Sequence, residues 1–149
     1  MDEADRTTFT RSSALLGALA GSLVLLTLAG CHGSQKIDYA RPEPTAITEG
    51  PVLDIQVFRN VTTIELTNTT ARSFKDATIW LNQRFSMPVG DIDIGESLDL
   101  PLSRFVDEFG DTFRAGGFFA TRDPDPVVLA QLETEGTLYG LVVGGNRIK

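Results

Sequence analysis

The sequence predicts an all-β domain, folded as an antiparallel β-sandwich with one short helical turn. Two observations predict it. From Val52 onward, apolar and polar residues alternate with a period of two in short segments, which is typical of strands that bury one face. Gly, Asn and Asp residues separate these segments at intervals of about 8–12 residues, the spacing that sandwich domains show.

The expected strands follow in chain order. Seven segments carry the alternation: residues 53–58, 63–67, 77–82, 92–94 and 98–100, and two more on either side of Glu135-Gly136. Gly95-Glu96 supplies the turn between the fourth and fifth segments. We expect Ile92 and Ile94 to face the core, which places Asp91 and Asp93 on the solvent side.

One segment has helical spacing instead. Its apolar residues lie three or four positions apart: Leu102, Phe105, Val106 and Phe109. Ser103 is the expected N-cap and Gly110 the expected C-terminal stop. We therefore expect a short helix that buries both phenylalanines and leaves Asp107 on the solvent-facing side.

The first thirty residues have the form of a secretory signal peptide. The uncharged run "ALLGALAGSLVLLT", residues 14–27, follows Arg6 and Arg11. The run is shorter than the roughly 20 residues that a membrane span needs.

Leu28-Ala29-Gly30-Cys31 follows this run, and the chain has no other cysteine. These four residues resemble the lipobox of bacterial lipoproteins. The resemblance implies cleavage before Cys31, lipidation of its thiol, and attachment to a membrane of the cell envelope, facing the periplasm or the cell surface. His32 stands where an aspartate is associated with inner-membrane retention, which favours the outer membrane. The alternative is that Cys31 is an ordinary buried cysteine.

The chain therefore divides into three parts: a signal peptide (1–30), a lipid-anchored flexible tether (31–51) and a β-domain (52–149). The tether is expected because residues 31–51 are polar, lack periodicity and contain Pro42, Pro44 and Pro51.

The segments "NTTARSFKDATIWLNQRF" (68–85) and "IDIGESLDLPL" (92–102) resemble immunoglobulin-like envelope modules of the FxLYD type. This chain and those modules share a polar Asn-Thr turn, a strand with an aromatic residue and a later Gly-Glu-Ser hairpin. The resemblance implies an immunoglobulin-like sandwich with a binding or structural role.

Composition narrows the function. The net charge of −7 disfavours nucleic acid as a partner. The only histidine is His32, beside the lipidation site, so we expect no nucleophile–histidine site and no enzyme activity. We expect neither a metal nor a cofactor, because the carboxylates near Asp91 and the "RDPDPV" segment (122–127) are better explained by strand faces and turns.

Four aromatic residues are candidates for a binding surface: Trp80, Phe113, Phe118 and Phe119. Exposed aromatics are enriched at interfaces, although burial in the core is the favoured explanation for Trp80 and for the phenylalanines. We expect a non-catalytic protein-interaction or structural module of the cell envelope, with an envelope protein as its partner. The alternative is a small-ligand or carbohydrate binder with an aromatic pocket around residues 113–119.

Cys31 tests the membrane attachment. Replacing Cys31 with Ala removes the only thiol, so the precursor is expected to remain uncleaved at this position and to lose labelling by radioactive palmitate. Persistent palmitate labelling of the variant would refute the lipobox interpretation.

Overall fold

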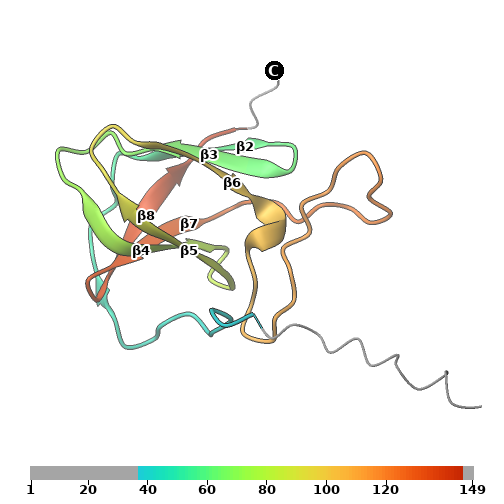
Figure 1. Cartoon of the computed structure of the whole chain (residues 1–149), viewed down its shortest axis with the longest axis horizontal. Helices are drawn as coiled ribbons and strands as arrows, with labels where there is room; N and C mark the ends of the chain where they lie inside the picture. Colours follow the sequence, from blue (N-terminus) through green and yellow to red (C-terminus); the bar gives the residue numbers. More distant parts are fainter. Residues whose placement is uncertain (1–36, 146–149) are drawn as a thin grey trace, which may run out of the picture. The chain divides into compact units, whose positions relative to one another are not determined.

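The computed structural model describes residues 37–145, which fold as an all-β domain with one short 3-10 turn (Figure 1). The predicted signal peptide, the lipobox residues Leu28, Ala29 and Gly30, and Cys31 lie outside the described residues. The elements in chain order are β1 (Thr48–Glu49), β2 (Gln56–Asn60), β3 (Thr63–Thr67), β4 (Phe74–Leu81), β5 (Phe85–Ile92), β6 (Ser97–Pro101), η1 (Leu102–Arg104), β7 (Ala130–Thr134) and β8 (Thr137–Val143).

The strands form one mixed sheet that curls, in the order β5-β4-β7-β8-β2-β3-β6, with β1 paired to β8. Most neighbours are antiparallel, as expected. Two pairs are parallel, β1 with β8 and β2 with β8, so the prediction of purely antiparallel pairing is wrong. The all-β class with one helical turn is confirmed, whereas the immunoglobulin-like two-layer sandwich stays a prediction.

The parallel pairing arises because residues 48–57 run beside β8 over its whole length. Thr48 pairs with Thr137 at one end, and Val57 pairs with Val143 at the other. Between these strands, the Leu53 N–H donates to the Gly140 carbonyl at 2.9 Å. Gly50 is needed for this approach, since a Cβ there would lie 2.5 Å from the Tyr139 ring.

Part of the predicted tether belongs to the domain. The Tyr39 hydroxyl donates to the Arg104 carbonyl at 2.7 Å, and Arg41 forms an ion pair with Glu133 at 2.6 Å. Residues 48–49 form β1. The expectation of a free tether up to residue 51 is therefore corrected: from Tyr39 onward the chain contacts the domain, because its side chains and backbone find partners on η1, β7 and β8.

A short bridge links the two ends of the strand order. After η1, Val106 exchanges two backbone hydrogen bonds with Ser86 of β5, of 2.8 and 3.1 Å. The chain leaving β6 at one end of the order is thereby joined to β5 at the other end. The bridge tightens the curl around the core.

Period-two alternation places the core correctly in most strands. The inward residues of β2, β3 and β4 are all buried, and so are Ile92 and Leu100. Ile94 is the exception, with 60% of its surface exposed, because it lies in the turn after β5 rather than on a strand. The prediction that Ile94 faces the core is therefore wrong.

The sequence pattern missed most of β5. Its segment "FSMPVGDI" alternates only from Phe85 to Val89, and it contains Pro88, which cannot donate a backbone hydrogen bond. The strand tolerates proline because, among the described strands, it pairs along its length only with β4, at one end of the strand order. Three residues join β4 to β5, and the first two, Asn82 and Gln83, have φ of 54° and 57°.

The predicted helix is only the three-residue 3-10 turn η1, and its N-cap is Pro101 rather than Ser103. Phe105 is fully buried as expected, but Phe109 is 81% exposed. The helix ends early because Phe105 is extended, at φ −77° and ψ 129°, and leads Val106 into its bridge with Ser86. Tertiary pairing here overrides the helical pattern.

Asp107 is buried rather than solvent-facing, with only 1% of its surface exposed. Its carboxylate accepts hydrogen bonds from Arg84 at 2.7 Å and from the N–H groups of Phe109 and Asp111 at 3.0 and 2.8 Å. Burial by itself raises the pKa of Asp107, but these hydrogen bonds outweigh it and lower the pKa below its ordinary value.

Substitution of Asp107 by Asn tests this arrangement, because the amide retains a backbone acceptor but removes the charge. We expect a loss of about 1–2 kcal/mol of stability near neutral pH. The folded-state pKa is the lower one, so the stabilisation is fully present above about pH 4 and disappears as the pH falls through that folded-state value.

Urea unfolding at a series of pH values measures this effect, and the two curves should converge in acid. The exposed neighbour Glu108 supplies the control, since Glu108→Gln should leave the midpoint unchanged. A difference that persists undiminished at low pH would contradict the assignment.

Candidate functional site

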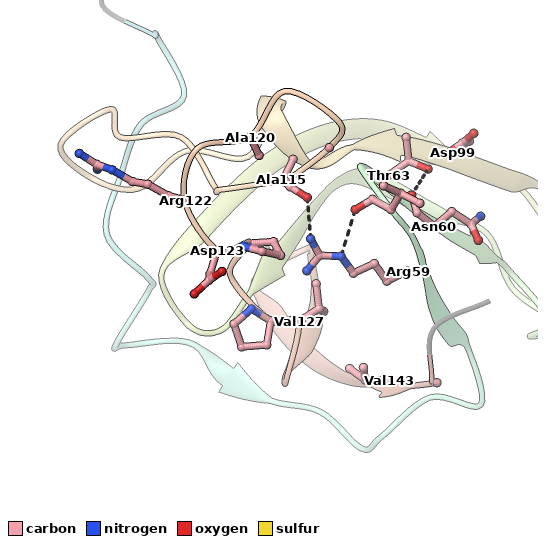
Figure 2. A pocket seen from close by; sticks show the side chains of 16 residues that line it. Arg59, Asn60, Thr63, Asp99, Ala115, Ala120, Arg122, Asp123, Val127 and Val143 are labelled. Atoms are coloured by element: carbon pink, nitrogen blue, oxygen red, sulfur yellow. Dashed lines mark hydrogen bonds between the residues drawn. The ribbon is translucent and has the colours of Figure 1, made fainter. Parts of the chain in front are cut away.

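An open groove of about 1040 Å³ lies between the β2–β3 turn and the chain that precedes β7 (Figure 2). One wall comes from β2, β3 and β6, and the other from residues 115–127. The end of β8 completes the lining. The lining residues are Arg59, Asn60, Val61, Thr63, Asp99, Ala115, Gly116, Gly117, Ala120, Arg122, Asp123, Pro124, Pro126, Val127, Val143 and Gly144.

Arg59 holds the two walls together, and Figure 2 shows its side chain crossing between them. Its Nε donates to the Val61 carbonyl at 3.2 Å, within the β2–β3 turn. On the other wall its Nη2 donates to the Ala115 carbonyl at 2.7 Å, and its Nη1 donates to the Asp125 carbonyl. A single side chain thus fixes the width of the groove.

The charge of Arg59 is offset mainly by these carbonyl dipoles. Among residues 37–145, four carboxylates form ion pairs, with Arg41, Lys75, Arg84 and Arg114. Within the same range, no carboxylate lies within ion-pairing distance of Arg59. Burial lowers the pKa of Arg59, and the charge of Asp125 opposes this shift. The groove therefore contains a half-buried cation, together with neutral donors and acceptors on Asn60 and Thr63.

Val61, on the rim of the groove, has a strained backbone. Its φ is 43°, in the left-handed region, and its side chain is 72% exposed. A β-branched side chain is disfavoured in that region, where Asn or Gly is the usual residue. The exposed valine gains little burial in return for this strain.

A closed loop forms the upper part of the second wall; we call residues 114–125 the diphenylalanine loop. Arg114 and Asp125 close its base. The Asp125 N–H donates to the Arg114 carbonyl at 3.0 Å, and the two side chains form an ion pair. Hydrogen bonds from Arg114 lower the pKa of Asp125. With its ends held together, the loop has the form of a compact Ω-loop.

Phe118 and Phe119 lie in this loop and are 95% and 90% exposed. Their rings contact each other edge to face, with centroids 5.0 Å apart, and neither ring lines the groove. These are the two residues of the predicted aromatic surface that the structure brings together at the surface.

Trp80 and Phe113 are both buried, so the prediction that they contribute to a binding surface is corrected. Phe113 packs edge to face on Phe85, with centroids 5.1 Å apart. The Trp80 indole donates to Glu133 at 2.6 Å, and the guanidinium of Arg41 lies 4.9 Å from the Trp80 ring centroid. The aromatic pocket expected around residues 113–119 is not formed by these rings.

The described residues 37–145 contain no cluster of three or more histidine, cysteine or acidic side chains placed to hold a metal ion. The carboxylate of Asp91 instead pairs with Lys75 at 2.6 Å. Within the same range, no helix is long and apolar enough to cross a membrane.

The groove displays cations, carboxylates, a hydroxyl and an amide, a mixture suited to hydrogen bonding with a polar chain.

Comparison of the chain with protein-family models, with curated proteins and with solved structures found no match. The resemblance to lipoproteins and to FxLYD modules therefore stays a prediction from the residues quoted above.

Sequence reasoning missed Arg59 and Val61. Arg59 is an isolated cation in an otherwise unremarkable strand, and its partners Ala115 and Asp125 are more than fifty residues away. The left-handed backbone of Val61 has a detectable basis, because the four residues "NVTT" must join two strands with a two-residue turn.

Substitution of Arg59 by Met tests its role in holding the walls together. Methionine fills similar space but donates no hydrogen bond, so we expect a loss of roughly 1–3 kcal/mol. We also expect the substitution to accelerate amide hydrogen exchange at Arg114 and Asp125 more than in the strands. Arg72→Met is the matched control, since Arg72 stacks on Phe74 and Tyr139 away from the loop. Equal acceleration at every amide would contradict local anchoring by Arg59.

Proposed function

We propose that this chain is a lipid-anchored protein of the cell envelope that binds an extended segment of another envelope protein in the groove beside Arg59, without catalysis. The observation that carries the proposal is Val61, an exposed apolar residue in a strained conformation on the rim of that groove. The proposal of a lipid anchor is based on the sequence around Cys31.

The chemistry of the groove supports a polypeptide as the ligand. A peptide backbone presents alternating donors and acceptors, and the lining offers the Thr63 hydroxyl, the Asn60 amide and the Arg59 guanidinium. Val127, Val143 and Pro126 add apolar surface for side chains. Asp99 lies on β6, which pairs only with β3 in the described part of the chain, so an extended segment has a strand edge to follow.

The strain at Val61 distinguishes a functional role from a structural one. Left-handed backbone costs a non-glycine residue about 1–2 kcal/mol, and an exposed side chain does not recover this by packing. Strained residues cluster at functional sites. A valine that stabilises neither its turn nor the core is well placed to contact a bound segment.

The test uses the full-length protein in its native host, with a photoreactive amino acid at Asp99 in the groove. We expect a discrete crosslink to one envelope protein. The same group at Asp93, an exposed position outside the groove, should not give that product.

Val61→Asn is then introduced beside the probe at Asp99. Asparagine tolerates the left-handed region, so this variant should be about 1 kcal/mol more stable and yet lose the crosslink. The matched control is Gln83→Asn, which makes a similar improvement at φ 57° in the β4–β5 turn and should retain the crosslink. Retention of the product in a stabilised Val61→Asn protein would refute the role of the groove.

A further inference from the structure

The diphenylalanine loop is a feature that binding in the groove does not use. Phe118 and Phe119 are almost fully exposed and are held on a loop with a closed base. The Ala120 N–H donates to the Gly117 carbonyl at 3.1 Å, which forms a turn across the two phenylalanines. Two exposed rings on an ordered loop point to a partner that takes up apolar side chains.

The charge around these rings distinguishes a lipid surface from other partners. The segment 115–122, "AGGFFATR", contains no carboxylate, although the chain as a whole has a net charge of −7. Its only charged residue is Arg122, which extends away from Arg59 in Figure 2. Aromatic rings next to a cation suit a membrane interface, where the rings enter the acyl boundary and the cation meets anionic headgroups.

The other highly exposed phenylalanine has the opposite surroundings. Phe109 is 81% exposed but lies among Asp107, Glu108 and Asp111. Carboxylates are repelled by anionic headgroups. The contrast singles out residues 115–122 of the diphenylalanine loop as an apolar segment without carboxylates; the loop's two carboxylates, Asp123 and Asp125, follow it, and Asp125 is paired with Arg114.

If Cys31 carries the anchor, covalent geometry limits how far Tyr39 can lie from lipid. Within residues 37–145, the Tyr39 hydroxyl donates to the Arg104 carbonyl at the end of η1. The eight residue-to-residue steps from Cys31 to Tyr39 span at most about 29 Å even when fully extended. Figure 1 shows the orange loop that precedes β7 projecting beyond the strands on the side of η1.

We propose that Phe118 and Phe119 insert into the interface of the membrane that holds the lipid anchor, so that the anchor and the loop together fix the orientation of the domain. This inference rests on the lipid anchor of the proposed function. It does not depend on the groove, which the crosslinking experiment tests separately.

The experiment uses the mature, lipidated protein reconstituted into phosphatidylcholine–phosphatidylglycerol vesicles, with and without brominated acyl chains. Trp80 is fully buried, so its emission serves as a constant background that the unsubstituted protein measures. In the Phe119→Trp variant, we expect blue-shifted additional emission that brominated lipid largely quenches. Phe109→Trp is the matched control, and its additional emission should remain unquenched.

Flotation of the vesicles distinguishes the hypothesis of loop insertion from the hypothesis of the lipid anchor. A Phe119→Trp protein that floats with the vesicles but is quenched no more than Phe109→Trp would overturn membrane insertion while leaving the anchor intact. Protein that does not float at all would refute the anchor on which the inference rests. Replacing the anionic lipid with zwitterionic lipid should reduce the quenching of Phe119→Trp, because Arg122 then loses the anionic headgroups that attract it.

Discussion

The backbone pairing of β8 is the constraint on which the rest of the domain depends. One edge of β8 pairs with β7, antiparallel, and the other with β1 and β2, parallel. In the described residues 37–145, β8 alone connects β5, β4 and β7 with β2, β3 and β6 by a continuous ladder. The groove depends on the same constraint, because Val143 and Gly144 reach it at the end of this strand.

Local patterns in the sequence were sufficient to predict the all-β class, most strands and the turn at Glu135-Gly136. Alternation works for β2, β3 and β4 because each buries one face against a common core. It failed for β5, where an edge position accommodates Pro88, and for the segment after η1, where Val106 pairs with Ser86 instead of continuing a helix. Both failures arise from tertiary contacts that a local window of sequence does not contain.

The candidate site was less predictable than the fold. Residues before Val52 fold back onto Trp80: the Arg41 guanidinium lies over its ring and pairs with Glu133, the β7 residue that accepts the indole N–H. The prediction of a proline-containing tether leaves that face of β4 without a covering segment. The groove depends equally on long-range bonds from Arg59. The aromatic candidates divide by location instead: Phe113 lies in the core, and Phe118 and Phe119 are at the surface.

The path of residues 39–57 has a mechanical consequence. Tension applied through the N-terminal end of this segment first loads the contacts of Tyr39 and Arg41, and then the ladder between residues 48–57 and β8. Such tension acts along the strands and across their hydrogen bonds. Several hydrogen bonds therefore carry the load together, in shear. A pull at the free end of an antiparallel hairpin would instead break them one at a time. Rupture under force is governed by the rate of unfolding, so this parallel seam lets the domain withstand pulling from one end.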